Sequence, residues 1–523
     1  MQQRESGPSS KLMPPSAGSY TSPATSAEPQ DLVPFYTPKN EDGGASREAE
    51  ARQVSRPPDK DAKKGSVLTR AIRIVLDADP DDRINLLEVI PPLKKFFINR
   101  KIHAAVRIIG ENIFSFIIIS GFLGPQDPSR NVALFIAWGM WWPSVVLSWF
   151  LLGRFWCGIC PFPGIGRILQ SGGYSFDLRI PRFLHRYGIY LAGFLFALIL
   201  WAEETMGLKE SPIGTAYLML AILAGALICS IIFPGQAWCR YLCPMGRIIG
   251  VGSVMSFTEL RADYHKCRTC TTFACRKGTE DTDGCPVYLG AVGVHNNQEC
   301  LVCGKCISLC DKDSPVFNLR SPYVELIKHK GRSITCTYII PLLMGSQLAR
   351  YAQDGVLAHW IASYGPDFHM LIFTILLGTG FLFILAVVHM GGMIFGVTGD
   401  AMLGRFSPMV PVLVPISFAG ELIIRLRYTL THLPDFMPTL GRQFGMDLSS
   451  MTFPISYKFL AFLDISIFTS ATLAGLHILF VFTEKEFKGL VTHGRYLLVI
   501  FLMIVVLEFY IVLGIAPILS KGF

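Results

Sequence analysis

The sequence is poor in charge. Asp, Glu, Lys and Arg make up 16% of its 523 residues, whereas an ordinary globular chain has roughly 25%. Hydrophobic residues make up 51%, and the mean hydropathy is +0.42. So few charges cannot cover a mostly water-exposed surface, which excludes most classes of soluble enzyme of this size.

The sequence also lacks the start of a secreted protein. Residues 1–66 have no apolar core segment and are rich in Ser, Pro, Gly and charge, which predicts a disordered cytoplasmic tail. Residues 67–103 have the pattern of amphipathic surface helices. The net charge of +8 is interpreted as basic cytoplasmic loops, so no nucleic-acid partner is expected.

Long apolar runs dominate the rest of the chain, and roughly 20 such residues suffice to cross a bilayer. Eight runs are clear, and a weaker one covers residues 334–348. The sequence therefore predicts a mainly α, polytopic membrane bundle of eight or nine spans in contact with lipid. Four spans belong to residues 104–260, and four or five belong to residues 330–523. The clear runs cover residues 104–123, 132–152, 187–201, 213–233, 370–395, 409–424, 459–482 and 497–519.

The first four spans are an internal duplication. Each half has two spans followed by Trp, a close pair of cysteines, Pro and Gly-Arg. The pairs are Cys157 with Cys160 and Cys239 with Cys243. Because two crossings separate the pairs, both lie on the same membrane face. Arginines gather between the second and third spans, which predicts that this face is cytoplasmic.

The two Cys-Pro pairs allow three interpretations. Cys157, Cys160, Cys239 and Cys243 could together close a third metal or cluster site. They could instead act as two redox dithiols. They could also be small apolar residues in turns that end a helix before proline.

Residues 261–325 contain eight further cysteines and are predicted to form an inserted cytoplasmic ferredoxin-like α+β domain. Their second half matches the bacterial iron–sulfur run C-x2-C-x2-C-x3-C. In ferredoxins with two clusters, the fourth cysteine of such a run binds the other cluster. Zinc modules use paired C-x2-C arms instead, whereas these eight cysteines divide into three plus one, twice.

The spacing therefore predicts two [4Fe-4S] clusters. The first cluster takes the cluster-one cysteines, Cys267, Cys270, Cys275 and Cys310. The second cluster takes the cluster-two cysteines, Cys300, Cys303, Cys306 and Cys285.

Two histidines in apolar spans are candidate haem ligands. His389 and His477 lie near the ends of spans that run parallel, so they could hold a b-type haem between them. The spacing of about 13 to 14 residues that is typical of two-haem bundles is absent. The alternative is an ordinary hydrogen-bonded role for each imidazole.

Two carboxyl groups also lie within apolar spans, where charge is unfavourable. Glu111 and Glu421 could handle protons beside a quinol. Alternatively, they form ion pairs inside the bundle with Arg107 and Arg425, each one helical turn away.

The two Cys-Pro motifs followed by a two-cluster cysteine block resemble the membrane polyferredoxin family. This family includes the nitrous-oxide reductase accessory protein and the membrane iron–sulfur subunit of the periplasmic nitrate reductase system. The resemblance covers residues 104–320, and residues 418–444 resemble the nitrous-oxide branch less specifically. The first Cys-Pro motif has two residues between its cysteines, where the family commonly has three. No flavin-binding domain is visible, and the C-terminal half has extra spans.

The resemblance implies electron transfer between the quinone pool, or a cytoplasmic donor, and a partner redox protein. It also implies that the clusters face the cytoplasm at the inner membrane. One alternative is an assembly factor that supplies electrons for the biogenesis of a respiratory metalloenzyme, as in a related branch. Another is a transporter with a regulatory ferredoxin module, although the later spans show no inverted repeat. The sequence identifies no catalytic residue.

Overall fold

The computed structural model describes residues 66–280, 282–327, 334–355, 357–363, 366–395, 409–486 and 493–518. The predicted disordered tail therefore lies, apart from residue 66, outside the described residues. Within them the chain is mainly helical, and eight helical segments are long and apolar enough to span a membrane. This confirms the prediction of a mainly α polytopic bundle.

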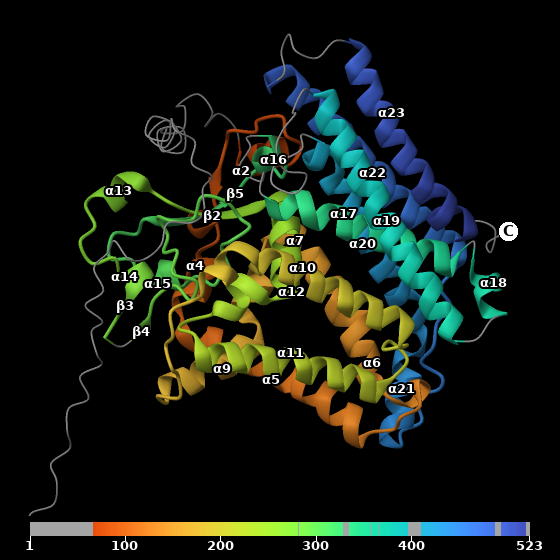
Figure 1. The fold of residues 1–523 in the computed structure, drawn as a ribbon. Coiled ribbons are helices and arrows are strands. Elements are labelled where there is room, and N and C mark those ends of the chain that lie inside the picture. Colours follow the sequence, from red (N-terminus) through yellow and green to blue (C-terminus); the bar gives the residue numbers. More distant parts are fainter. Residues whose placement is uncertain are drawn as a thin grey trace, which may run out of the picture. The chain divides into compact units, whose positions relative to one another are not determined.

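The spanning segments pack as two groups of helices (Figure 1). The four-span unit precedes the cysteine block, and the remaining helices follow it and form the C-terminal bundle. The four-span unit contains α5 (Arg100–Leu123), α6 (Val132–Leu134) continued by α7 (Trp142–Leu152), α10 (Arg182–Thr205) and α11 (Pro212–Ile232). The C-terminal bundle contains α19 (Pro366–Ile394), α20 (Met409–His432), α22 (Tyr457–Glu486) and α23 (His493–Tyr510).

The weak apolar run forms a ninth long helix, α17 (Ile334–Asp354), which packs against α19 and α20. The Tyr338 ring lies 5.4 Å from that of Tyr190 on α10. Near its other end, Arg350 joins an ion network that reaches Glu203 on α10. Because about 18 Å of α17 and about 20 Å of α10 separate these two contacts, α17 runs parallel to α10 across the bundle.

The polar residues of α17 explain its low hydropathy. Ser346, Gln347 and Arg350 are at most 1% exposed, so none of them faces lipid. The Gln347 side-chain amide donates to the Ser417 carbonyl oxygen at 2.9 Å. Neighbouring helices thus satisfy groups that would be unfavourable in hydrocarbon.

Buried ion pairs join the two groups of helices. Arg425 on α20 binds Glu203 on α10 at 2.6 Å and Glu421 at 2.8 Å. Arg350 binds the second Glu421 oxygen at 2.7 Å. Both intrahelical ion pairs proposed from the sequence are present, since Arg107 and Glu111 also approach to 3.5 Å.

Two π-helical segments lie in the four-span unit. One covers Phe135–Trp141, between α6 and α7, and the other covers Trp238–Leu242, which contains Cys239. π-helical turns are rare and often mark functional sites. Both segments contribute to the candidate site described below.

The cysteine block is closed at its base by a three-stranded antiparallel sheet of order β1-β5-β2. Strand β2 (Thr258–Ala262) precedes the eight cysteines and β5 (Pro315–Leu319) follows them, so their pairing brings both ends of the block together. Strand β1 (Ile84–Asn85) comes from the N-terminal segment, which also forms α2 (Val67–Val75), α3 (Leu86–Val89) and α4 (Pro91–Ile98).

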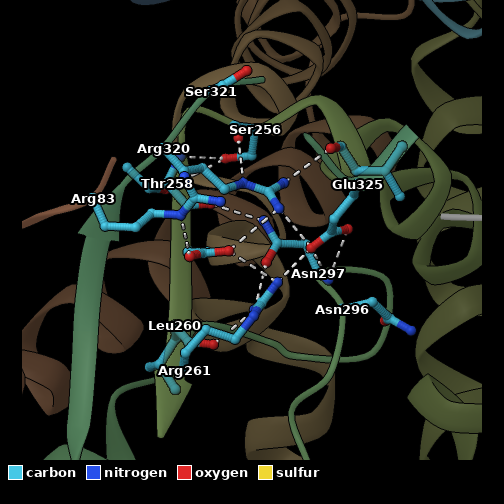
Figure 2. Close-up of polar contacts among 12 residues, drawn as sticks. Arg83, Ser256, Thr258, Leu260, Arg261, Asn296, Asn297, Arg320, Ser321 and Glu325 are labelled. Carbon is cyan, nitrogen blue, oxygen red and sulfur yellow. Dashed lines mark hydrogen bonds and ion pairs between the residues drawn. The ribbon is translucent and has the colours of Figure 1, made fainter. Parts of the chain in front are cut away.

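A buried polar network holds this base together (Figure 2). Glu325, on α16 (Val324–Ile327), accepts from Arg320 at 2.6 Å and from Arg261 on β2. The Asn297 amide donates to the Thr258 carbonyl oxygen at 2.8 Å and accepts from Arg261 at 3.0 Å. The network therefore ties the sheet to the loop that leads into the second cysteine run.

Candidate metal centres

The cluster-one cysteines lie on two separate segments that meet at Ser314. The Ser314 hydroxyl is 3.0 Å from the Cys267 sulfur, and its backbone N–H donates to the Cys310 sulfur at 3.4 Å. Cys267 lies in the short helix α13 (Tyr264–Arg268), and Cys310 follows α15 (Lys305–Leu309). The fold thus brings the distant Cys310 beside the first run, as the predicted cluster-one set requires.

The cluster-two cysteines surround a single space. Cys285, Cys300, Cys303 and Cys306 all line one cavity of about 350 Å³. Its other walls are mostly apolar side chains, including Leu260, Val287 and Leu289. Four thiols around an apolar hollow fit the ligand set of an iron–sulfur cluster. The 13 cysteines whose side chains the structure describes are free of disulfide bonds.

The backbone of the second run is held in an unusual conformation. Val302 has φ +50° and Gly304 has φ +72°, both in the left-handed region. A Cβ at Gly304 would clash with the ring of Phe97 from α4. Left-handed β-branched residues are rare and collect at functional sites, so packing by α4 holds the loop that presents the cluster-two thiols.

The two sets of thiols differ in their surroundings. Hydrogen bonds from the Phe273 backbone N–H and the Thr272 hydroxyl lower the pKa of Cys270. Burial raises the pKa of Cys300 to about 12 and that of Cys306 well above its usual value. Because metal ligands must be deprotonated, a cluster held by Cys300 and Cys306 would displace protons from these thiols.

The four Cys-Pro cysteines also share one space. Cys157, Cys160, Cys239 and Cys243 all line a cavity of about 870 Å³ inside the four-span unit. Arg154 lines the same cavity, and its guanidinium lies 3.9 Å from the Cys157 sulfur. The structure therefore brings the two repeated loops together around a common hollow.

The Cys-Pro loops contact the cluster-two loops directly. A Cβ at Gly158 would lie 2.8 Å from the Leu301 carbonyl oxygen and 3.0 Å from the Cys303 Cα, so only glycine fits there. In the second repeat, the Gln236 N–H donates to the Pro286 carbonyl oxygen at 3.1 Å. The cavity and the cluster-two site are therefore adjacent.

The two histidines proposed as haem ligands have different environments. Nε2 of His477 lies 2.7 Å from a carboxylate oxygen of Asp77, a residue that follows α2 in the chain. His389 lies on α19. Haem ligation by this pair stays a prediction. In the part of the chain that the structure describes, no three His, Cys, Asp or Glu side chains are placed to hold a single metal ion.

Sequence reasoning missed the residues that support the cysteines. Phe97 packs on the cluster-two loop, and Ser314 bridges two cluster-one sulfurs. The sequence predicts Arg154 as a cytoplasmic charge anchor, with binding of a quinone oxygen as the alternative, and gives no sign of its contact with Cys157. A serine four residues after the last cysteine gives no signal by itself, because its role depends on the β2–β5 pairing.

Comparison with known protein families gives a match to a family described as a 4Fe-4S binding domain. It covers residues 134–175 and 215–252. These segments contain the two Cys-Pro pairs and precede the eight-cysteine block. The match therefore follows the duplication of the four-span unit.

Several curated proteins are similar over part of the chain. An uncharacterized protein of Methanocaldococcus jannaschii is 28% identical over 187 residues, which cover 34% of this chain and 68% of that protein. YccM of Escherichia coli, named as an electron transport protein, is 32% identical over 21% of this chain and 28% of its own length. NirI of Paracoccus denitrificans is 28% identical over 32% of this chain and 26% of its own length. No solved structure gives a significant match.

Proposed function

We propose that this chain, which matches a 4Fe-4S binding domain and is similar over part of its length to the electron transport protein YccM, passes electrons between the quinone pool and a partner redox protein. Two [4Fe-4S] clusters carry the electrons, one held by each predicted set of four cysteines. The observation that carries the proposal is the cavity lined by Cys285, Cys300, Cys303 and Cys306. When bound, each cluster accepts and releases one electron at a time.

The arrangement of the two sets supports an order of transfer. The cluster-two cysteines lie next to the Cys-Pro loops of the four-span unit, as the Gly158 contact indicates. The Cys285 N–H donates to the Cys275 carbonyl oxygen at 3.1 Å, which links the cluster-two cysteines to the cluster-one cysteines. Electrons from the membrane would reach cluster two first, then cluster one, and then the partner.

We further propose that Cys157, Cys160, Cys239 and Cys243 hold a third cluster, because a cluster can bridge thiols that lie too far apart for a single metal ion. Two observations support this, namely that all four line one cavity and that the matched 4Fe-4S binding domain covers these loops. The buried Arg154 guanidinium would offset the negative charge of the thiolates. Burial raises the pKa of Cys243 to about 11, so this site also needs a bound cation to keep its thiols deprotonated.

The orientation is proposed from charge. Arginines between the second and third spans favour the cytoplasmic side for the Cys-Pro loops, and therefore for the cysteine block that contacts them. We place the chain in the inner, or cytoplasmic, membrane with the cysteine block facing the cytoplasm. A cysteine-accessibility assay on intact cells and on inverted vesicles would test this side directly.

Anaerobic purification followed by an EPR redox titration tests the function. We expect iron and inorganic sulfide in equal amounts, with about eight iron atoms per chain for two clusters and about twelve if the Cys-Pro site holds a third cluster. A quinol should reduce the clusters and become a quinone, giving one electron to each of two clusters and two protons to water. A colourless or zinc-loaded protein, or clusters that dithionite reduces but no quinol does, would refute the proposal.

A further inference from the structure

The cavity that contains the Cys-Pro cysteines extends beyond them into the four-span unit. We propose that its far end, lined by Trp138, Trp141, Trp142, Ile199 and Leu218, binds the headgroup of a membrane quinone. This end is called the tryptophan end below. The inference rests on the proposed function, because it names the place where the quinone pool meets the chain.

The lining of the cavity suits a flat, apolar ligand, because small-molecule sites are lined mostly by hydrophobic and aromatic side chains with a few polar groups. Five of the eight tryptophans of the chain line it. Residues from the second, third and fourth spans form its walls, so the hollow lies at the level of the hydrocarbon, where quinones dissolve.

A continuous row of aromatic rings connects the two ends of the cavity. The rings of Trp142 and Trp141 are 5.3 Å apart, and those of Trp141 and Trp156 are 5.8 Å apart. Trp156 immediately precedes Cys157. A ring stacked on this wall would therefore lie next to the thiols of the Cys-Pro site, through which its electrons would pass to cluster two.

Within the part of the chain that the structure describes, two buried N–H groups of the wall lack acceptors. The Trp141 indole N–H is buried without a hydrogen-bond partner among the described residues, and so is Nε of Arg154. By contrast, the Trp138 indole N–H donates to the Thr215 hydroxyl at 3.0 Å. Buried donors without partners are unfavourable, and the two carbonyl oxygens of a quinone are acceptors that would satisfy them.

The local backbone supports a site built for a ligand. Trp138 and Trp141 lie three residues apart in the π-helical segment Phe135–Trp141, and Trp142 follows it. The i, i+3, i+4 spacing of the three tryptophans places their side chains on one face of the helix, and all three line the cavity. π-helical turns are kept in proteins mostly where a function needs them.

Fluorescence quenching tests the inference on the full-length protein, purified with its clusters and placed in lipid nanodiscs. A short-chain ubiquinone or menaquinone analogue is titrated while tryptophan emission is recorded. Because five of the eight tryptophans line the cavity, saturable quenching of more than half of the emission is expected. Non-saturable quenching, as from quinone dissolved in lipid, would overturn the inference.

A matched pair of variants on α10 locates the binding. Ile199→Phe adds a ring inside the cavity, whereas Leu198→Phe adds the same ring at a neighbouring position whose side chain is 47% exposed. Ile199→Phe should weaken quinone binding at least tenfold, and Leu198→Phe should leave it unchanged. Equal affinity in the two variants would place the quinone elsewhere.

A second variant, Trp141→Phe, keeps the inference testable if Ile199→Phe does not fold. Trp141→Phe keeps an aromatic ring and removes the unpaired N–H, and it should weaken binding several-fold while the cluster absorbance stays intact. Unchanged binding would overturn the role of this donor and, with it, the proposed pose. If quinol reduces the clusters equally in all these variants, the cavity assignment fails and the electron-transfer function stands. If quinol reduces no cluster in the unmodified protein, the function itself fails.

Discussion

The two sets of ferredoxin-type cysteines have the same number of sulfurs but differ in the exposure of the residues beside them. Next to the cluster-one cysteines lie the exposed residues Thr271, Thr272 and Phe273, the last of which is 44% exposed. Next to the cluster-two cysteines lie Leu301 and Val302, each 3% exposed. The cluster-one cysteines, called the outer set below, are therefore open to a soluble partner. The cluster-two cysteines, called the inner set, are enclosed between the sheet and the four-span unit.

This difference indicates a division of labour. An exposed cluster can exchange electrons with a protein that docks and leaves, whereas an enclosed cluster can exchange them only with its fixed neighbours. Exposure and nearby hydrogen bonds also set cluster potentials. The four predictions below test whether the inner and outer positions differ as the structure indicates.

The largest effect is expected from removing one ligand of each set in turn. Cys306→Ser should abolish reduction of the outer cluster by quinol but not by dithionite, because the inner relay is lost. Cys270→Ser should leave the inner cluster reducible by quinol and abolish electron transfer to a soluble acceptor dye. EPR spectra of anaerobic membranes distinguish the two results.

Cys229→Ser is the matched control for both variants. Cys229 is 7% exposed on α11 and belongs to none of the three cysteine sets. Cys229→Ser should leave quinol reduction of both the inner and the outer cluster unchanged. If the outer cluster of Cys306→Ser still responds to quinol, the inner-to-outer order of transfer is wrong.

The next effect concerns the base beneath the inner set. Glu325→Gln leaves the buried Arg261 and Arg320 short of a countercharge, and breaking a buried pair of this kind destabilises by about 3–5 kcal/mol. The guanidinium concentration at which half of the visible cluster absorbance is lost should therefore fall, as expected for a loss of stability of this size. An unchanged midpoint would show that the network in Figure 2 does not support the cysteine block.

A smaller effect is expected at the loop of the inner set. Gly304→Ala forces an L-residue into the left-handed region, which costs about 1–2 kcal/mol, and its Cβ would also clash with Phe97. Gly173→Ala is the control, because Gly173 has φ +81° but nothing within 4 Å of the added Cβ. Thermal loss of the inner-cluster EPR signal should therefore occur earlier in Gly304→Ala than in Gly173→Ala.

The smallest effect is expected on the exposed side of the block. Asp313→Asn removes the ion pair of Asp313 with Lys94, in which the Asp313 side chain is 69% exposed. Exposed pairs contribute about 0–1 kcal/mol, so guanidinium resistance should barely change. A loss as large as that of Glu325→Gln would contradict the contrast between the open and enclosed sides.

The parts of the molecule that could be predicted from sequence have strong local signals. Apolar runs identified eight spans, and the cysteine spacing indicated the iron–sulfur class. Helix α17 stayed uncertain because hydropathy counts residues without knowing their neighbours. Arg350 and Gln347 look unsuited to a membrane until Glu421 and Ser417 are seen beside them.

The remaining features depend on contacts between distant segments. Strand β1 has only two residues, and its pairing with β5 joins positions more than 200 residues apart. The Phe97 contact with Gly304 is of the same kind. The shared cavity of the Cys-Pro loops was one of three open interpretations, because a repeat shows that two loops are alike but not that they meet.

The pairing of Glu203 with Arg425 has a consequence for shorter versions of this molecule. A chain that stopped after the cysteine block would keep Glu203, which is 1% exposed here, and would lose Arg425. That carboxylate would then face lipid beside Lys209 as its remaining countercharge. A protein that uses the four-span unit alone is therefore expected to have an uncharged residue at this position, an arginine from another subunit, or a carboxylate that depends on Lys209 alone.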